Sequence, residues 1–299
     1  NALLDADSYT YLIYARDLAR GSLFGRPGFY EVFKDHWPPH HQVNLHSACR
    51  HMVDGRIYHG IEIGYPLLLA LPITLFGPAS VYFVNPFLFL MLIAFFFLTV
   101  KMIFSGEGRG KNLIALISVL LLLLLPADRL ISSSTKILRD VPPLVFLIVS
   151  FYCLLRFNIA GRGSTRLLWV FWGAFFLGMS AMIRFHYLIM IIPFYLYLIV
   201  SLRSSEQSFR WKISSSIFSL LGLFLFVVPV LVRDMLVQKN IFYTAGILSN
   251  YLVSSTGPPQ LFGREYFQRS GLWYFDYLFR VYDPGLIFLG LIGLVSGLR

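Results

Sequence analysis

The sequence is poor in charged residues. Only 13% of its 299 residues are Asp, Glu, Lys or Arg, whereas a soluble domain carries roughly 25%. Hydrophobic residues make up 57%, and apolar runs such as 81–100, 113–125 and 213–232 approach or reach the ~20 residues that cross a bilayer. A water-soluble fold could not hide so many wholly apolar helices. The composition therefore predicts a multi-pass membrane protein.

Cysteine is scarce, and no Asn-x-Ser/Thr sequon occurs. Cys49 falls in a predicted loop and Cys153 inside a predicted span, so the two cysteines give no disulfide framework. The chain begins at Asn1 in a polar stretch, without Met and without a signal segment. It ends at Arg299, just after an apolar run. We therefore expect a fragment, with at least one span before Asn1 and more chain after Arg299.

The predicted fold class is all-α, a polytopic transmembrane helical bundle with interfacial helices on its outer face. The run 64–76 is short and carries Pro66 and Pro72, so we expect it to lie at the membrane surface rather than to cross. The predicted parts are an outer loop (1–79), six transmembrane helices (80–232), a second outer loop (233–284) and a truncated seventh helix (285–299). The predicted spans are 80–101, 112–127, 141–157, 167–183, 186–202, 213–232 and 285–298.

The division at Arg184 follows from length, because the 36 residues from 167 to 202 are too many for one crossing.

The net charge of +10 reflects membrane insertion rather than nucleic-acid binding, because the basic residues are spread among short loops between spans. If 64–76 does not cross, one set of loops holds ten basic residues and two acids. The remaining thirteen acids and all seven histidines fall on the other side. The positive-inside rule makes the basic side cytoplasmic. The outer face then comprises 1–79, 128–140 and 233–284, with the short turn 184–186.

The first candidate site is an acidic stretch near the start of the chain. Asp5 and Asp7 precede an amphipathic segment on which Tyr11 and Tyr14 share one face, and Gly21 suits its C-terminal cap. Asp7 is either a general base that takes a proton from an acceptor hydroxyl or the N-cap of this helix. The residues alone leave both interpretations open.

Asp140 is a second candidate acid on the same predicted face. It precedes the sequence Val-Pro-Pro, which suits the first turn of the span 141–157, so it is either an N-cap or a second acid near the site.

Three cationic or titratable residues also face outward. Arg184 and His186 form the tip between two spans, and Arg233 ends a later span. A guanidinium matches the oxygens of a phosphate group bidentately, so a phosphate is one partner for these arginines. The alternatives are a carboxylate on a neighbouring loop for Arg184 and the adjacent Asp234 for Arg233.

Histidines crowd the first outer loop, but their spacing fits no metal-binding motif. Surface, acceptor-contacting or pH-sensing roles suit them better. These residues are His36, His40, His41, His46, His51 and His59.

The order of these motifs resembles the GT-C superfamily of membrane glycosyltransferases. That superfamily includes the protein O-mannosyltransferases, the lipid A aminoarabinose transferase and the catalytic subunit of oligosaccharyltransferase. The resemblance rests on the acidic motif with its Tyr-containing helix, an interfacial helix, a second outer acid, an outward Arg and a span that ends in Pro-x-x-x-Arg. These are Asp7-Ser8-Tyr9 through Ala15-Arg16 to Gly21, Gly64-Tyr65-Pro66-Leu67, Arg139-Asp140-Val141-Pro142, Arg184, and Pro229 to Arg233. The chain departs from the mannosyl and aminoarabinose branches in having Asp7-Ser8 instead of Asp-Glu, and in its long His-rich loop.

The resemblance implies an enzyme of the bacterial inner membrane, or an equivalent membrane, with its active site on the non-cytoplasmic side. It implies inverting transfer of a sugar from a polyprenyl-phosphate donor to a protein, lipid or glycan acceptor. Asp7 and Asp140 would be catalytic. Asp5, Tyr11, Arg184, His186 and Arg233 would bind substrate, with the cations stabilising the departing lipid phosphate. The oligosaccharyltransferase branch uses a divalent metal and other branches do not, so metal dependence stays open.

Two other functions remain alternatives. A transporter or flippase of lipid-linked glycans places ionisable groups near the midplane, whereas the charges here lie at the ends of the spans. A polysaccharide polymerase or ligase should depend more on outer arginines and histidines than on Asp7.

Overall fold

The computed structural model describes residues 6–22, 51–53, 56–58, 63–104, 110–124, 141–159, 164–184, 187, 190–204 and 207–238. The chain divides into two compact units, one made of Asn1–Leu123 with Ala127–Thr244, the other of Leu124–Pro126 with Ala245–Arg299. All described residues except Leu124 belong to the first unit.

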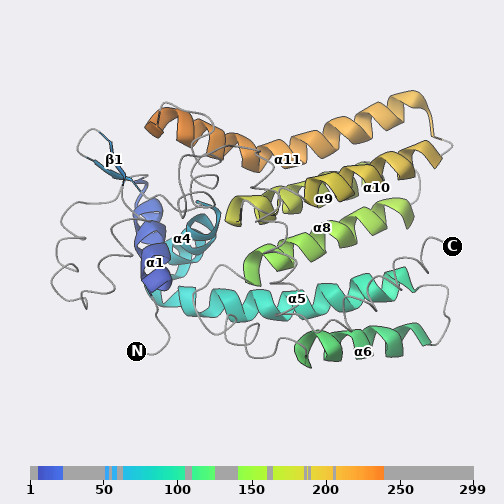
Figure 1. Cartoon of the computed structure of the whole chain (residues 1–299), viewed down its shortest axis with the longest axis horizontal. Helices are drawn as coiled ribbons and strands as arrows, with labels where there is room; N and C mark the ends of the chain where they lie inside the picture. The colour runs from blue at the N-terminus through green and yellow to red at the C-terminus, as the bar shows by residue number, and fades with distance from the viewer. Residues whose placement is uncertain are drawn as a thin grey trace, which may run out of the picture. The chain divides into compact units, whose positions relative to one another are not determined.

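Four helical stretches in the described residues are long and apolar enough to cross a membrane. They contain α5 (Val81–Ile103), α8 (Val141–Ile159), α9 (Ser164–Ile183) and α11 (Phe209–Gln238), which are labelled in Figure 1. They match the predicted spans 80–101, 141–157, 167–183 and 213–232. The predicted all-α, multi-span fold class is thereby confirmed.

Two further apolar helices are shorter. The helices α6 (Lys111–Leu124) and α10 (Ile191–Ser204) have 14 residues each. At 1.5 Å per residue each is roughly 21 Å long, less than the ~30 Å of a hydrocarbon core. The predicted crossings 112–127 and 186–202 therefore stay predictions, as does 285–298, which lies outside the described residues. The predicted break at Arg184 is confirmed, because α9 ends at Ile183 and α10 begins at Ile191.

The first helices of the chain are short as well. The helix α1 (Ala6–Ala19) corresponds to the predicted amphipathic segment, and α4 (Gly64–Phe76) to the predicted interfacial helix. With 13 residues, α4 is roughly 20 Å long, also less than the ~30 Å of a hydrocarbon core, and its place at the membrane surface stays a prediction. Between them lies an antiparallel strand pair that the sequence did not predict, β1 (His51–Val53) and β2 (Arg56–Tyr58).

The helix α11 is longer than the span predicted for it. It has 30 residues, begins before residue 213 and continues through Pro229 and Arg233 to Gln238. The candidate span within α11, Phe209–Val232, ends where the span 213–232 was predicted to end, and the helix continues beyond it. Pro229 is tolerated because neighbouring groups can satisfy the carbonyl that a proline leaves without its helical donor.

The helix α9 forms the centre of the bundle. It packs along both α8 and α11, and α5 packs along α8 (Figure 1). Glycine lets α9 and α11 approach closely, since a Cβ at Gly222 would collide with the carbonyl oxygen of Phe171. A buried hydrogen bond from Ser180 Oγ to the carbonyl oxygen of Pro143, 2.8 Å long, joins α9 to α8.

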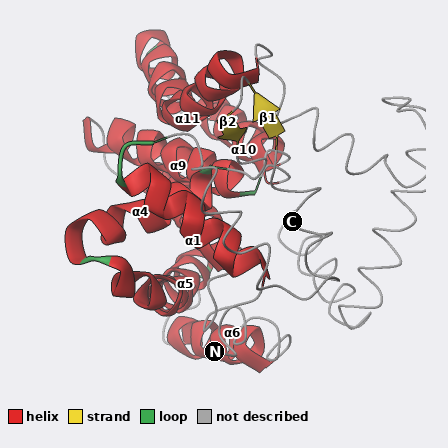
Figure 2. Cartoon of the chain, turned by 90° about the vertical axis from the view of Figure 1, so that its left-hand side faces the viewer, coloured by secondary structure: helices red, strands yellow, loops and turns green. Residues whose placement is uncertain are grey.

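The bundle has two distinct ends. At the first, the N-termini of α5 and α8 and the C-terminus of α9 contribute Val81, Val141 and Ile183 to one buried cluster that also contains residues of α1 and α4. Figure 2 shows α1 and α4 in front of the helix ends. We call this the α1 end.

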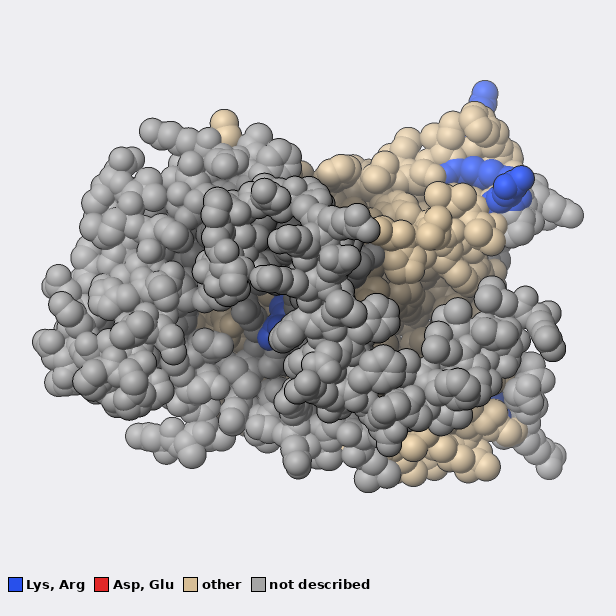
Figure 3. Space-filling view, in the orientation of Figure 1, with Lys and Arg blue, Asp and Glu red and all other residues tan. Residues whose placement is uncertain are grey.

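The opposite end, the basic end, contains the C-terminus of α8 and the N-termini of α9 and α11. The rings of Phe157 and Trp211 stack with centroids 5.7 Å apart, and the guanidinium of Arg166 lies over both. Figure 3 shows basic side chains gathered over this end of α9, α10 and α11.

Candidate active site

The helix α1 is capped as the sequence predicted at its C-terminus but not at its N-terminus. Gly21 has φ 76°, and the N–H groups of Gly21 and Ser22 donate to the carbonyl oxygens of Leu18 and Asp17, both at 2.9 Å. This pair of bonds is a Schellman motif, so the predicted role of Gly21 is confirmed. The helix begins at Ala6, which places Asp7 within the first turn rather than at the N-cap position. An acid in the first turn is still favoured by the helix dipole.

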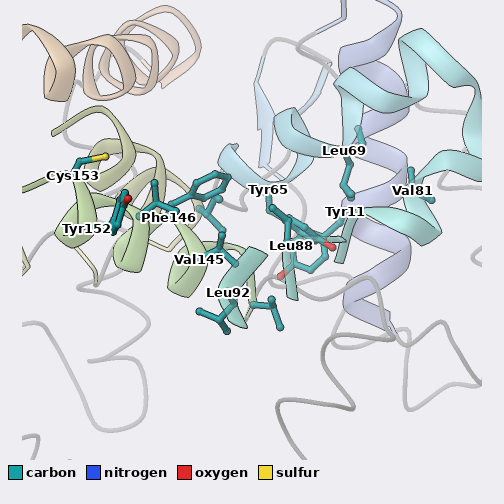
Figure 4. Close-up of a cluster of buried hydrophobic side chains, with 14 residues drawn as sticks. Tyr11, Tyr65, Leu69, Val81, Leu88, Leu92, Val145, Phe146, Tyr152 and Cys153 are labelled. Carbon is teal, nitrogen blue, oxygen red and sulfur yellow. The ribbon is translucent and has the colours of Figure 1, made fainter. Parts of the chain in front are cut away.

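One face of α1 is buried against the bundle. Tyr11 is 2% exposed and Tyr14 is fully buried, which confirms that they share a face. Tyr11 belongs to the cluster that includes Val81 and Val141, as Figure 4 shows in part. Tyr14 packs with Met182 at the end of α9. Position 7 lies one helical turn before Tyr11 and thus on the same face of α1.

The helix α4 joins α1 to the ends of α5 and α9. The ring of Tyr65 lies edge-on to that of Tyr11, with centroids 5.1 Å apart. The hydroxyl of Tyr65 donates to Oδ1 of Asn85 on α5 at 3.1 Å, and both side chains are buried. Beside Tyr65, a Cβ on Gly64 would lie 2.5 Å from the carbonyl carbon of Met182. Two consecutive residues of α4 thus contact three other helices.

Arg184 lies at the α1 end. It directly follows Ile183, which is buried in the cluster shared with Tyr11. Its N–H donates to the carbonyl oxygen of Ser180 at 3.1 Å, and its own carbonyl oxygen accepts from the N–H of Tyr187 at 3.0 Å. The residue is half-buried. These bonds hold the backbone of Arg184 in the turn between α9 and α10.

The remaining predicted site residues are described only in part or not at all. Asp5, Asp140 and His186 lie outside the described residues. Asp7 and Arg233 are placed by their helix backbones in α1 and α11, without their side chains. Tyr11 contacts Tyr65, and its role in binding substrate stays a prediction.

Metal binding also stays open. Within the described ranges no group of three or more His, Cys, Asp or Glu side chains is arranged to hold a metal ion. The crowded histidines of the first outer loop lie outside these ranges or, for His51, have no described side chain.

Sequence reasoning did not single out the junction of Gly64, Tyr65 and Asn85 as part of the site. The signal for Asn85 was present, because an amide inside an apolar span is costly unless it is hydrogen-bonded. Nothing local identified its partner, which is 20 residues away.

A model of the dolichyl-phosphate-mannose-protein mannosyltransferase family matches residues 78–236, more than half of the chain. The chain belongs to this family. The resemblance to the GT-C superfamily is thereby confirmed, since this family is part of it. Membership makes the protein an integral membrane glycosyltransferase that uses a lipid-linked sugar donor. No curated protein and no solved structure matches the chain.

The family match covers some of the predicted site. Asp140, Arg184, His186 and Arg233 fall within the matched residues, whereas Asp5, Asp7 and Tyr11 precede them. The helix α1, with position 7, is therefore tied to the family region through the packing of Tyr11 rather than through the match itself.

Proposed function

We propose that this protein transfers a sugar from a polyprenyl-phosphate donor to an acceptor hydroxyl with inversion at the anomeric carbon, and that Asp7 is the general base. The observation that carries the proposal is the junction made by α4. Through Tyr65 and Gly64, this helix contacts both α1, which bears position 7, and the end of α9, which leads into Arg184.

The chemistry needs a base and a cation on opposite sides of the reacting carbon. The carboxylate of Asp7 takes the proton of the acceptor hydroxyl, and the acceptor oxygen forms a bond to the anomeric carbon. The bond from this carbon to the phosphate oxygen breaks on the opposite face, and the lipid phosphate leaves with the electron pair. A positioned base contributes ~10²–10⁴-fold to the rate of such a transfer.

Arg184 suits the other side of the reaction. Negative charge grows on the phosphate as the bond breaks, and a preorganised guanidinium lowers the barrier by stabilising this charge. His186 and Arg233 are candidates for the same phosphate. Asp140 directly precedes Val141 of the α1-end cluster, which supports a role as the second acid of this site.

The non-cytoplasmic face is the proposed side of the reaction. The described basic residues Lys101, Arg156 and Arg166 lie towards the end of the bundle opposite to α1, and the positive-inside rule assigns that end to the cytoplasm. The family description supports mannose as the sugar and protein as the acceptor. Lipid and glycan acceptors are the alternatives that product analysis separates.

The test is Asp7→Asn in the complete protein in membranes, assayed with a polyprenyl-phosphate sugar. We expect transfer to fall at least ~10²-fold while donor binding stays nearly intact. Glu107→Gln is the matched control, because the predicted topology assigns Glu107 to the cytoplasmic side, and it should keep its turnover. Full turnover by the Asp7 variant would remove Asp7 from the base role. Retained configuration in the product, measured by NMR, would contradict the inverting mechanism.

A further inference from the structure

We propose that Gly64, Tyr65 and Asn85 form a positioning device that fixes α1, and with it position 7, relative to the turn that carries Arg184. This inference rests on the proposed function, because it concerns the alignment of the proposed base with the proposed phosphate-binding arginine. None of the three residues needs to contact a substrate for the device to work.

The first contact of the device is between backbones. A Cβ on Gly64 would lie 2.5 Å from the carbonyl carbon and oxygen of Met182 and 2.6 Å from the amide nitrogen of Ile183. Real Cβ atoms do not approach backbone atoms this closely. The backbone at the start of α4 therefore packs directly against the backbone at the end of α9, one residue before Arg184. Only glycine allows this close approach.

The second contact joins the next residue of α4 to α1 and α5. The Tyr65 side chain is 1% exposed, and its ring meets Tyr11 edge-on while its hydroxyl reaches Asn85. Figure 4 shows Tyr11 and Tyr65 side by side, near Leu88 of α5. Because adjacent residues make both contacts, a shift of α4 on α9 also displaces α1 relative to α9.

The hydrogen bond explains why the contact is specific. Apolar side chains pack in several similar registers, whereas a buried hydrogen bond between a phenol and an amide has a preferred distance and direction. Asn85 is 2% exposed and lies among apolar residues near the start of α5. The Tyr65–Asn85 pair thus selects one placement of α4, and through Tyr11 one rotation of α1.

This rotation matters because of helical periodicity. Position 7 precedes Tyr11 by four residues, so the contact that orients Tyr11 also orients the face on which position 7 lies. A reacting group displaced by about 1 Å can lose on the order of 100-fold in rate. The device therefore acts on turnover rather than on donor affinity.

The kinetic test uses the complete protein in membranes and removes single hydroxyl groups. Tyr65→Phe deletes the donor to Asn85 and keeps the ring that packs on Tyr11. We expect kcat to fall about 10- to 100-fold while the KM for the polyprenyl-phosphate sugar changes less than about twofold. Tyr82→Phe is the matched control, because Tyr82 lies on α5 one turn from Asn85 and is 45% exposed. It should leave both constants unchanged.

A double variant checks that the pair acts as a unit. If the bond between Tyr65 and Asn85 carries the effect, Tyr65→Phe combined with Asn85→Leu should be no slower than the worse single variant. Independent, multiplying losses would overturn the pairing.

A distance measurement separates this inference from the proposed function. Spin labels at Arg16→Cys and Leu168→Cys, both exposed, report the distance between α1 and α9 in a chain with Cys49→Ser and Cys153→Ala. We expect Tyr65→Phe or Gly64→Ala to shift or broaden this distance. An unchanged distance with unchanged kcat overturns the positioning role, and a raised donor KM at constant kcat makes Tyr65 a substrate contact instead. Suppose that Asp7→Asn keeps its turnover while Tyr65→Phe or Gly64→Ala still shifts the distance. The assignment of Asp7 as the base then fails, and the coupling of α1 to α9 stands.

Discussion

The two ends of the bundle are built by different means. At the basic end, aromatic rings and a guanidinium stack between neighbouring helices. At the α1 end, a short helix is seated backbone to backbone on α9 and linked to α5 by one buried hydrogen bond. The first arrangement tolerates small shifts because stacking contacts have broad geometry. The second is sensitive to displacement, which suits the proposed alignment of reacting groups at this end.

The largest expected difference between the two ends is in donor affinity, and it comes from Arg184→Ala. Loss of a charge-assisted bond to phosphate costs about 1.5–3 kcal/mol, so donor affinity should fall about 10- to 100-fold. Titration with the polyprenyl-phosphate sugar measures the change. Arg203→Ala, an exposed arginine at the other end, is the control and should bind the donor normally. Unaltered donor affinity in the Arg184 variant would assign this residue to a structural ion pair.

A substitution in the contact between α9 and α11, which run between the two ends, should lower the stability of the whole bundle. A valine at Gly222 collides with the backbone of α9 at Phe171, and overpacking of this kind costs about 1–3 kcal/mol. We expect Gly222→Val to lower the midpoint of thermal unfolding in detergent. Gly110→Ala is the control, because a Cβ there meets nothing within 4 Å. Equal midpoints for the two variants would show that α9 and α11 do not need their close approach.

A smaller and local effect is expected at the end of α1. Gly21 has φ 76°, a conformation that costs an L-residue roughly 1–2 kcal/mol. No atom lies within 4 Å of the position that a Cβ would take there. Gly21→Ala should therefore strain only the backbone and loosen the last turn of α1. Hydrogen exchange should speed up at residues 16–19 and stay constant at residues 209–212. Acceleration in both segments would mean that the two ends are not independent.

The smallest loss of stability is expected from a substitution at the basic end. Arg166→Gln removes a guanidinium that lies 4.5 Å from the ring centroid of Phe157 and 4.8 Å from that of Trp211. Because the residue is only half-buried, the loss should be about 0.5–1 kcal/mol of stability. The unfolding midpoint should fall slightly while kcat/KM stays the same. A marked loss of turnover would extend the functional region to this end.

The sequence predicted the parts of this comparison that depend on local chemistry. Run length identified the four long helices, helical periodicity placed Tyr11 and Tyr14 on one face, and the conformational freedom of glycine marked the end of α1. The distribution of charge predicted that Lys101, Arg156 and Arg166 share one end. Each of these signals is carried by residues close together in the chain.

Tertiary contacts could not be predicted in the same way. Tyr65 meets Asn85 across 20 residues, and Gly64 meets Met182 across more than a hundred, so no local pattern pairs them. The apolar run predicted the end of the candidate span at Val232, but it did not predict that α11 continues to Gln238, because a helix ends only where its backbone pairing stops. Of the site itself, the sequence supplied candidate residues, and the structure supplied the helix that connects α1 to α9.

The continuation of α11 through Arg233 to Gln238 sets a height above the bilayer. These six residues add roughly 9 Å beyond the apolar stretch, which is more than the ~5–8 Å thickness of one headgroup layer. For a helix that crosses upright, Gln238 would therefore reach the water side of that layer. In the proposed reaction, the acceptor would then approach from the water and the lipid-linked donor from the bilayer, so that the two reactants would use separate routes.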